Sequence, residues 1–597
     1  MKTTILTFIL LTTIVVQPVV AQEGWQWVRG LGNYDFTPSA ECACSLELDK
    51  WGNVYVAGEI GPDLELDSLG SYSINNVRYA LKSSSLGGSD IWLAKYSPEG
   101  KQIWFRSAGS KQDDRFYEMI VDSLGNTFIA GYIPPNYDSA WTFNNKGLKS
   151  YERGAFIAKL DSAGSLIWNK SFYGDTLSPS LLKNIFNAYP LKLFKDDDEL
   201  NVIIEGGSYS NSNFNSLLFG GDTLANGIHG LKLDLNGNLI NYETFPFPNA
   251  NNLPPRTIVN KDERNNYFFA QIMTGRSIIT STDTLRVQNT NQNYINSSVI
   301  AIDSALHPSW NYISNINTFE LIRGATYHSG ELFVLLEFGL NTPDTITYGN
   351  FNNGLPLNKF GGNGFLSFDY SNGQILGYVS ETYSSHSTDV FLESIFVNED
   401  FIALSGHLDG EVSYGAGADT IKNEVHFDGF FVVFDRNGKF LHQEILLSDS
   451  AGYGLSANNI SIQDSILYLT GQFRDKIVLH GRDSVTVKSG KDIYLAKYDL
   501  RHVLKTSLKE NPLFNFYKAD NGILAYPNPT QRQVTLMGKA LNNQAQLFSI
   551  SGQLVRTYRL DENAFQQQIS LDNLDSGIYF LIIVGESEKQ TVRIVKQ

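Results

Sequence analysis

Cysteine is almost absent from this chain of 597 residues, which contains only Cys42 and Cys44. A single pair, one residue apart, cannot supply a disulfide framework, so the fold must depend on other interactions. On a strand the two side chains would share one face, where a bond between residues i and i+2 is geometrically unfavourable. We interpret them as two small, half-buried core residues. A local redox pair and a metal site are the alternatives, although two thiolates are too few ligands for a metal.

Positive charge is also scarce, because 46 Lys and Arg residues stand against 62 Asp and Glu residues, a formal net charge of −16. Nucleic acids and anionic membranes are bound through clustered Lys and Arg, and the sequence has no basic stripe. We therefore expect no nucleic-acid partner. From residue 523 onward seven basic residues face six acidic ones, whereas the rest of the mature chain has 38 against 56. The negative charge belongs to this longer part, at about −18.

No apolar run reaches the roughly 18 residues that a transmembrane helix needs. The N-terminal run from Ile5 to Val16 is shorter, and it follows Lys2 and precedes Val19-Val20-Ala21. This pattern predicts a secretory signal peptide over residues 1–21. Because Gln22 rather than Cys follows the expected cleavage point, we do not expect a lipid anchor there.

Sequence motifs of common catalysts are missing too. There is no Gly-x-Ser-x-Gly elbow, no His-Glu-x-x-His and no phosphate loop, and the nine His residues are scattered singly. We interpret the acidic run Asp196–Glu199 as a solvated hairpin turn. Trp141 lies in a long polar insertion and is a candidate for an exposed ligand contact. Four recurring Trp residues are expected to pack between repeats: Trp92, Trp104, Trp168 and Trp310. No catalytic, cofactor-binding or metal-binding residue is assigned, and no cofactor is expected.

Two phrases recur along most of the chain. The first is a strand, a tight turn and a strand, as in Ile91–Trp104 and Phe156–Trp168. The second is a strand, an Asp-x-x-Gly-Asn turn and a strand, as in Leu46–Gly58 and Met119–Gly131. Each phrase is found seven times, with weaker copies in the middle of the chain. Self-similarity at a fixed period indicates a propeller or a solenoid.

The repeats are longer than a compact four-stranded blade of roughly 40 to 45 residues. Lys95 and Lys159 are 64 residues apart, and the next interval, to Lys232, is 73 residues. The excess lies in polar insertions between the second phrase and the following first phrase. Short apolar alternations in these insertions are interpreted as a fourth strand of the blade: Ser216–Phe219, Glu411–Tyr414 and Ile477–Leu479.

The turns between the strands carry Asp-x-x-Gly and Asn-Gly sequences, which supply the positive φ that hairpin turns require. Asp234–Gly237 and Asp435–Gly438 also resemble the start of a calcium loop. A calcium loop needs further oxygen ligands and a late bidentate Glu, which neither segment has. We therefore predict plain hairpin turns at both places.

The two ends of the repeat region are incomplete in complementary ways. Trp25–Arg29 resembles the second half of the first phrase, whereas Asp492–Tyr498 is its first half with nothing after it. Joining them would complete a seventh blade and remove the open sheet edges. Residues 23–500 resemble the bacterial seven-bladed β-propeller repeat family, on Asp-Ile-x-Leu-Ala-Lys-Tyr followed by Gly-Asn-Val-Tyr-Val-x-Gly. We predict an all-β chain with a seven-bladed β-propeller over residues 22–500; six or eight blades are alternatives.

After a polar linker over residues 501–522, the composition changes. Short strands at regular spacing over residues 523–597 predict a small Ig-like β-sandwich. From the strand pattern alone it could be an accessory domain of unspecified role.

The same 75 residues contain Tyr-Pro-Asn-Pro, a Gly-x-Leu-Val turn, Leu-x-x-Gly-x-Tyr and a basic residue near the end. The positions are Tyr526, Pro527, Asn528, Pro529, Gly552, Gly577, Tyr579 and Lys596. In these motifs the segment resembles the type A C-terminal sorting domain of the type IX secretion system. The resemblance implies that the secretion machinery recognises the tail. It also implies export through the periplasm to the surface of a Gram-negative bacterium or the medium, with removal of the tail.

These features favour a secreted or cell-surface binding or adhesion protein with an extracellular glycan or protein ligand, because a ring with loops suits recognition. A polysaccharide-acting enzyme on a propeller scaffold is an alternative, and it would need two carboxylates at glycosidase separation. A structural surface-layer protein is another.

Overall fold

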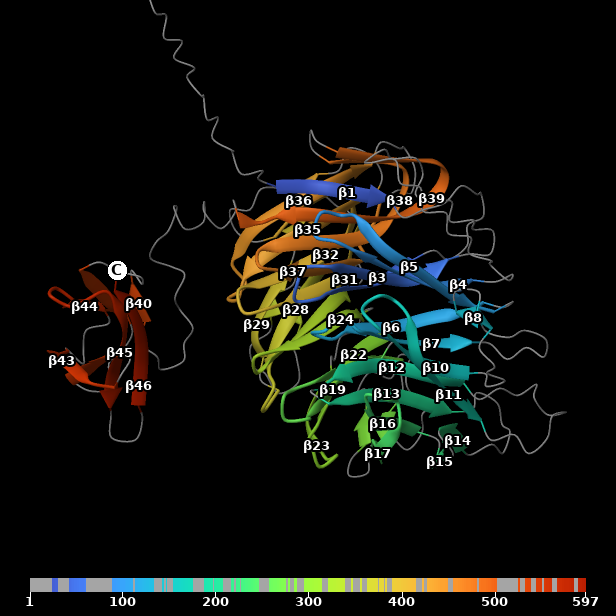
Figure 1. Ribbon diagram of the computed structural model, residues 1–597, viewed down its shortest axis with the longest axis horizontal. Helices are drawn as coiled ribbons and strands as arrows, with labels where there is room; N and C mark the ends of the chain where they lie inside the picture. Colours follow the sequence, from blue (N-terminus) through green and yellow to red (C-terminus); the bar gives the residue numbers. More distant parts are fainter. Residues whose placement is uncertain are drawn as a thin grey trace, which may run out of the picture. The chain divides into compact units, whose positions relative to one another are not determined.

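The computed structural model shows a chain built from β-strands and turns (Figure 1). It describes residues 24–30, 42–60, 89–110, 113–133, 142–143, 146–147, 154–174, 187–196, 198–207, 216–219, 222–225, 227–245, 257–274, 277–279, 284–286, 295–313, 320–338, 345–346, 355–356, 362–373, 375–380, 382–383, 389–414, 421–422, 427–448, 455–479, 483–501, 524–526, 532–537, 544–549, 552–560, 566–584 and 589–596. The chain forms two compact units, within residues 1–504 and 505–597. The expected all-β, propeller-like fold class is confirmed. The expected signal peptide (1–21) and nearly all of the expected linker (501–522) lie outside the described residues.

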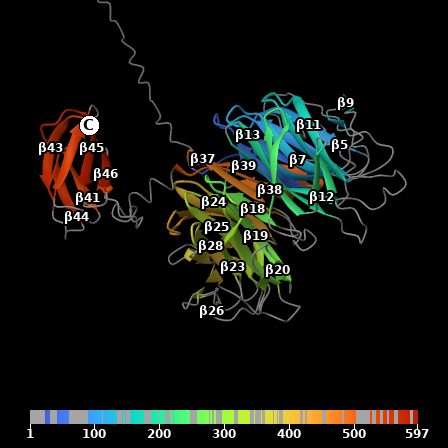
Figure 2. The same cartoon turned by 90° about the horizontal axis from the view of Figure 1, so that it is seen from below.

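The larger unit repeats one arrangement of four antiparallel strands. Four such sheets are β2-β3-β4-β5 (Cys42–Leu48, Val54–Ile60, Asp90–Tyr96, Gln102–Gly109), β6-β7-β10-β11 (Arg115–Val121, Thr127–Ile133, Gly154–Leu160, Leu166–Gly174), β12-β13-β16-β17 (Asn187–Lys195, Glu199–Gly207, Gly227–Asp234, Leu239–Thr244) and β18-β19-β22-β23 (Ile258–Lys261, Tyr267–Thr274, Ile295–Ile302, Pro308–Ile313). Three more are β24-β25-β28-β29 (Glu320–His328, Glu331–Phe338, Gly362–Asp369, Ile375–Ser380), β31-β32-β35-β36 (Asp389–Val397, Phe401–Asp409, Asp428–Asp435, Phe440–Ser448) and β37-β38-β39-β1 (Asn459–Gln463, Ile466–Leu479, Asp483–Asp499, Gly24–Gly30). We number these sheets one to seven in this order; several appear edge-on in Figure 2.

The first strands of these sheets contact one another in a closed circuit, β2 to β6, β12, β18, β24, β31, β37 and back to β2. The cores lie between neighbouring sheets. For example, one buried cluster combines Val56 and Trp92 of sheet one with Tyr468 and Leu495 of sheet seven. The third strand β4 is buried at every position, because it has a neighbouring sheet on both faces. Each sheet therefore depends on the next one to exclude water from its side chains.

The chain ends complete sheet seven, as the half-phrases predicted. β1 pairs antiparallel with β39, so that Trp25 lies opposite Tyr498 and Val28 opposite Ala496. Figure 1 shows β1, in blue, beside the orange β38 and β39. Trp25 is buried and meets Phe431 and Tyr498 edge to face, with ring centroids 5.8 and 4.9 Å apart. The N-terminal strand thus contributes both backbone pairing and core volume to the last sheet.

The insertion segments behave differently from the prediction. They are not fourth strands of their own blade: Ser216–Phe219 and Ile477–Leu479 pair with the preceding sheet, whereas Glu411–Ser413 belongs to a separate three-stranded sheet. Leu218 of Ser216–Phe219 (β14) lies opposite Tyr173, Ser413 of Glu411–Ser413 (β33) opposite Thr382, and Ile477 opposite Ser448. The remaining short strands are β8 (Thr142–Phe143), β9 (Lys146–Gly147), β15 (Asp222–Ala225), β20 (Ser277–Ile279), β21 (Thr284–Arg286), β26 (Thr345–Ile346), β27 (Leu355–Pro356), β30 (Thr382–Tyr383) and β34 (Ile421–Lys422). Pairing of this kind covers part of the outer edge strands.

The Asp-x-x-Gly segments are hairpin turns, as predicted. In the turn after β16, Asp234 Oδ1 accepts hydrogen bonds from the N–H groups of Asn236 and Asn238, and Gly237 has φ of 76°. Asp435 caps its turn in the same way, and Gly438 has φ of 77°. The carboxylates are occupied by the turns, which explains their recurrence without calcium.

A tryptophan on the fourth strand of one sheet fixes the turn between the third and fourth strands of the next. Its indole N–H donates to a turn carbonyl, and its ring lies against the turn glycine. We call this the Trp–turn contact. The four instances are Trp27 to Pro98 (3.3 Å), Trp104 to Ser162 (3.0 Å), Trp168 to Leu235 (2.9 Å) and Trp310 to Tyr370 (2.6 Å). The expected packing between repeats is confirmed. Trp104, Trp168 and Trp310 make it through the Trp–turn contact, whereas Trp92 makes it by filling the core between sheets seven and one.

The smaller unit is a two-sheet β-sandwich, as expected. One sheet is β40-β41-β44 (Leu524–Tyr526, Gln533–Met537, Gln566–Ser570), and the other is β43-β42-β45-β46 (Leu554–Arg559, Gln544–Ser549, Gly577–Val584, Lys589–Lys596). Val534, Leu547, Leu581 and Ile594 lie in the core between them. Among the residues that the structure describes, none forms a helix with the length and apolarity needed to cross a membrane.

The Trp–turn contact can be tested with a matched pair of glycines. Gly52 and Gly164 both have positive φ, but an added Cβ at Gly164 would lie 2.9 Å from Trp104, whereas at Gly52 the nearest atom, in Pro98, is 3.5 Å away. Gly52→Ala should cost about 1–2 kcal/mol of unfolding free energy from backbone conformation alone. Gly164→Ala should cost about 1–3 kcal/mol more, because the indole must move. Urea unfolding measures both, and equal losses would contradict the role of this contact.

Candidate functional site at the insertion face

The strand order separates the connections of the ring into two faces. The turns between first and second strands, and between third and fourth strands, are short, as in residues 49–53 and 97–101. The strand ends that flank the long insertions lie at the opposite face, because consecutive strands are antiparallel. We call these the turn face and the insertion face. Long connections carried by a rigid scaffold are the usual place for binding residues.

The first strands carry a β-bulge near the insertion face. The register shifts at the same point in sheets one, two, three, five and six. The extra residues are Cys44, Tyr117, Leu191, Arg323 and Glu393. We call these the bulge positions. Bulges redirect side chains and are common beside binding sites.

A recurring glycine explains three of these bulges. Gly58, Gly131 and Gly406 lie opposite the bulged strand, where an added Cβ would be 1.7, 2.6 and 2.0 Å from a backbone carbonyl oxygen. The glycine in the second phrase therefore permits close approach of the bulged strand. Ile204 and Leu336 occupy this place in sheets three and five, so the bulge also forms without glycine there.

The bulge positions present different chemistries around the closed circuit of first strands. Cys44 is exposed and Tyr117 is 37% exposed. Arg323 forms an ion pair with Glu337, and both are partly buried. Glu393 Oε1 is 3.9 Å from His407 Nδ1. Burial lowers the pKa of His407 to about 4, with a further contribution from Arg323. His407 is thus neutral at pH 7, and the Glu393–His407 contact is not an ion pair.

A group of three charged side chains follows the bulge positions on sheets one to three. Lys192 Nζ lies 2.9 Å from Glu118 Oε2, and Glu47 is the neighbouring carboxyl on β2. Desolvation raises the pKa of Glu47 to about 7; Lys192 opposes the shift and Glu118 adds to it. Desolvation lowers the pKa of Lys192, but Glu118 and Glu47 outweigh this and raise it. These first strands thus hold an ion pair beside a carboxyl whose pKa burial raises toward neutral pH.

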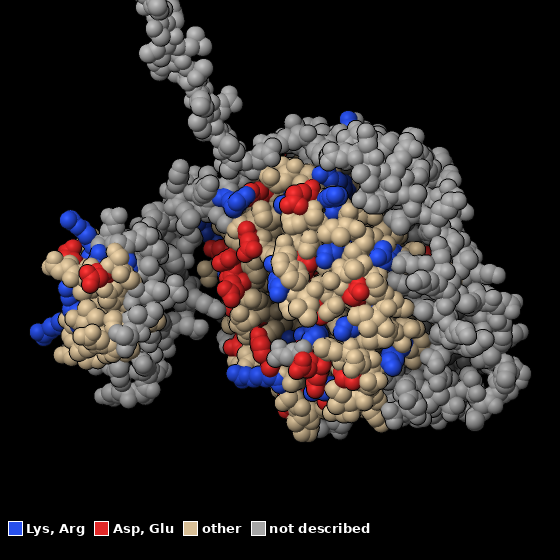
Figure 3. Space-filling model, in the orientation of Figure 1, with Lys and Arg blue, Asp and Glu red and all other residues tan. Residues whose placement is uncertain are grey.

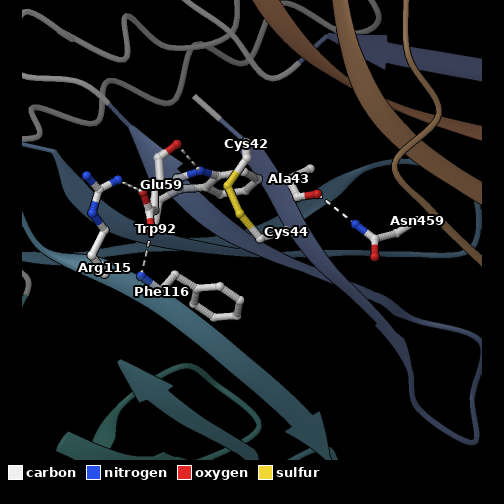
Figure 4. Close-up of a disulfide and its surroundings, with 8 residues drawn as sticks. All are labelled: Cys42, Ala43, Cys44, Glu59, Trp92, Arg115, Phe116 and Asn459. Atoms are coloured by element: carbon white, nitrogen blue, oxygen red, sulfur yellow. Dashed lines mark hydrogen bonds and ion pairs between the residues drawn. A yellow bond between two sulfur atoms is a disulfide. The ribbon is translucent and has the colours of Figure 1, made fainter. Parts of the chain in front are cut away.

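Around Cys44, three sheets meet (Figure 4). Asn459 of sheet seven donates to the carbonyl of Ala43 at 2.7 Å. Glu59 accepts from Arg115 and from the N–H of Phe116 in sheet two, each at 2.9 Å. Burial raises the pKa of Glu59, partly offset by these two donors.

The cysteines contradict the interpretation as unpaired core residues. Cys42 and Cys44 form a disulfide with a Cα–Cα distance of 5.3 Å. On a regular strand, residues i and i+2 are about 6.6 Å apart. The bulge at Cys44 shortens this distance from the upper limit of the disulfide range to near its usual value of about 5.5 Å. Only Ala43 between them is in the core.

Other residues singled out from the sequence have structural partners or lie outside the described residues. Asp196 closes the predicted hairpin turn and pairs with Lys261 of the next sheet at 2.6 Å. His442 Nε2 lies 2.7 Å from the Tyr498 hydroxyl. Trp141 is not among the described residues. Within the described part of the chain, no group of three or more His, Cys, Asp and Glu side chains is placed to hold a metal ion.

The expected sorting residues are distributed over the sandwich. Tyr526 pairs with Thr535 at the end of β40, and residues 527–529 lie outside the described part. Gly577 lies opposite Lys596 on the neighbouring strand. Tyr579 is buried, and its hydroxyl donates to the carbonyl of Asp575 at 2.8 Å.

Gly552, in the turn before β43, has φ of 81°, and an added Cβ would meet nothing within 4 Å. Leu574 packs against the sandwich core. Most of the Leu-x-x-Gly-x-Tyr motif thus shapes the fold of the tail, and Gly552 shapes an exposed turn.

Charge is mixed on the face that Figure 3 shows. Acidic and basic side chains are interspersed over its described part, without a continuous basic band among them.

Comparison with known proteins places the tail in a family. Residues 524–597 match the family described as "Secretion system C-terminal sorting domain". The chain therefore carries the sorting tail of the type IX secretion system, and it is a secreted or outer-surface protein. No curated protein matches the chain.

Among solved structures, "Phage phi92 endosialidase" aligns with 97% of this chain and 90% of its own at 9% identity and a TM-score of 0.33. "Quinohemoprotein Alcohol Dehydrogenase from Comamonas testosteroni" aligns with 80% of this chain and 76% of its own at 10% identity and a TM-score of 0.29. "Bacillus licheniformis Rhamnogalacturonan Lyase PL11" aligns with 80% and 91% at 10% identity and a TM-score of 0.26. These similarities are too weak to support any statement about activity.

The Glu47 carboxyl gives a pH prediction. Its folded pKa of about 7 lies above the ordinary value of 4.5, so the folded chain binds more protons between these values and loses stability as pH rises through them. Glu47→Gln removes the ionisation, so it should change little at pH 5 and stabilise by on the order of 2 kcal/mol at pH 8. Thermal melts at both pH values measure the difference. A variant equally affected at pH 5 and pH 8 would show that Glu47 is not desolvated.

Proposed function

We propose that the mature chain is a binding or adhesion protein whose seven-bladed β-propeller takes up an extracellular glycan or protein ligand at the insertion face. The observation that carries this proposal is that the two faces of the ring differ in their contacts and connections. Trp–turn contacts tie the turn face of one sheet to the next, whereas the strand ends that flank the long insertions lie at the other face, together with the exposed bulge positions Cys44 and Tyr117. A rigid frame with variable connections on one side suits recognition.

The bulge positions are suited to contact a ligand. Tyr117 offers an exposed phenol, which contributes large contact area at low entropy cost. Arg323 and Glu393 offer charged donors and acceptors from the opposite part of the circuit of first strands. The ligand is expected to be neutral or mixed in charge, because the ring carries about −18 and no basic stripe.

The tail supports the location in which this binding takes place. We propose that residues 523–597 are the export address, recognised after removal of the signal peptide at residues 1–21 and then cut from the ring at the outer surface. Tyr526, Pro527, Asn528, Pro529, Gly552, Gly577, Tyr579 and Lys596 are the proposed sorting residues. Because the two compact units divide near residue 504, the ring can remain folded after the cut.

A polysaccharide-acting enzyme is the second candidate, favoured by the carboxyls on β2 and β6. Glu47 is protonated for part of the time at neutral pH, as a general acid must be, and Glu118 is paired with Lys192. Release of reducing ends from a polysaccharide by the mature chain, abolished in Glu118→Gln, would replace the binding proposal with this one.

Ligand binding at the insertion face is tested with two exposed tyrosines. Tyr117 is one of the bulge positions and is 37% exposed, and Tyr242 on β17 is 46% exposed. A glycan array and a panel of extracellular matrix proteins should identify a ligand of the mature chain. Tyr117→Ala should then weaken binding by about tenfold or more, and Tyr242→Ala should leave it unchanged. Equal losses would place the site elsewhere.

Self-association without any ligand would favour a surface-layer role, and tight, salt-dependent DNA binding would contradict the charge argument.

The sorting role of the tail is tested in a host with a type IX secretion system. Removal of residues 523–597 should leave a folded ring in the periplasm, and fusion of the tail to an unrelated exported protein should carry that protein outward. Mass spectrometry of the surface or medium form should show a chain that ends before residue 523. A form that still ends at Gln597 would contradict removal, and normal export of the tailless chain would contradict the sorting role.

A further inference from the structure

The Cys42–Cys44 disulfide lies where reagents from solution can reach it. Cys44 is exposed, Cys42 is partly exposed, and Ala43 between them faces the core. The two sulfur atoms therefore lie on the side of β2 away from Ala43, where they are bonded to each other (Figure 4). Access of a thiolate to one sulfur of a disulfide is the first requirement for thiol–disulfide exchange.

The disulfide joins two residues that are separated only by Ala43, so the loop that it closes is very short. A disulfide stabilises mainly by restricting the unfolded chain, and this effect decreases as the loop shortens. The disulfide therefore contributes little to the free energy of unfolding. The exported chain has no other cysteine, so no second disulfide shares a stabilising role with it.

The local structure is held by contacts that do not involve sulfur. Ala43 pairs with Gly58, and Ser45 pairs with Ala57, on either side of the bulge. Asn459 fixes the carbonyl of Ala43 from sheet seven, and Glu59 ties the same edge to sheet two. Gly58 leaves room for the Cys42 carbonyl, which would be 1.7 Å from an added Cβ. The bulge and its neighbours can therefore keep their pairing when the sulfur atoms separate.

We propose that Cys42 and Cys44 are a redox-active pair that exchanges with thiols at the insertion face while the ring stays folded. The substrate class is a small thiol or an exposed protein dithiol in the periplasm or at the cell surface. A thiolate attacks the exposed Cys44 Sγ, a new S–S bond forms to Cys44, and Cys42 Sγ leaves as a thiolate that takes a proton from water. The thiolate of a second thiol attacks the partner's sulfur in the mixed disulfide, an S–S bond forms between the two partner sulfur atoms, and Cys44 Sγ leaves as a thiolate that takes a proton from water. Two thiols are oxidised to one disulfide, and Cys42 and Cys44 are reduced to two thiols.

The order of attack follows from exposure. Cys44 is the more exposed residue of the two, so it is the site of the mixed disulfide, and Cys42 is the leaving thiolate. The chain has no third cysteine, and attack by Cys42 on the mixed disulfide would only restore the starting bond, so a second thiol from the partner completes the exchange.

The first experiment uses the chain without the expected signal peptide, residues 22–597, in native buffer with dithiothreitol. Samples are blocked with iodoacetamide at intervals, and alkylated cysteines are counted by mass spectrometry. Both cysteines should become alkylated within about tenfold of the rate for the urea-unfolded chain, with unchanged Trp fluorescence and melting temperature. Protection by about a hundredfold or more in the folded chain, or melting of the ring on reduction, would show a structural bond and overturn the proposal.

The second experiment distinguishes the two cysteines. Each single variant is incubated with oxidised glutathione, and the mixed disulfide is measured by its mass. Cys42→Ser should accumulate the mixed disulfide at Cys44, and the matched Cys44→Ser should react about tenfold more slowly at Cys42. Equal rates, or a faster reaction at Cys42, would overturn the assignment of Cys44 as the attacked sulfur. If neither variant folds, the bond is a structural requirement and the proposal fails.

Discussion

Backbone pairing between β1 and β39 is the interaction on which the rest of the ring depends. Every core in the ring lies between two sheets, so each sheet needs a neighbour on both faces. Without β1, sheet seven would lose its fourth strand, the buried Trp25 and the Trp27 contact to the turn of sheet one. The closed circuit of first strands would then lack its outer support between sheets seven and one.

The Trp–turn contact shows how a repeat sequence encodes contact with its neighbour. Trp and Gly lie in successive repeats rather than in the same one, as with Trp104 and Gly164. The glycine is needed for a positive φ and also for the close approach of the indole. One short turn motif thus serves both the local hairpin and the junction between sheets.

Much of this fold could be predicted from the sequence because its signals are local or repeated. The Asp-x-x-Gly turns, the alternating strands and the complementary half-phrases all depend on residues close together in the chain. The placement of Ser216–Phe219 could not be predicted, because a short apolar alternation shows a strand but not which sheet edge it joins. Which edge the strand joins depends on which sheet edge lies close to it in the folded chain.

The candidate site was harder to predict than the fold. Tyr117, Arg323 and Glu393 form no motif, because each comes from a different strand and they share only a register position. A bond between Cys42 and Cys44 was only an alternative in the sequence analysis, because the bulge that favours it cannot be recognised from the cysteine spacing. The available signal was the recurring glycine at positions such as Gly58 and Gly131, which marks close backbone approach. In the tail, Tyr579 and Leu574 belong to a motif that the sequence shows directly, and both also contribute to the structure of the sandwich.

Closure by the chain ends also sets the order of folding. Val28 and Ala496 are paired although they lie more than 450 positions apart, so this contact carries a large loop-closure entropy and forms late. A nascent or partly translocated chain cannot complete the ring until β39 has emerged, and its terminal sheet keeps an open edge until then. Cleavage after Ala21 would leave only Gln22 and Glu23 ahead of β1. Signal processing a few residues further along the chain would therefore remove part of the ring's own closing strand.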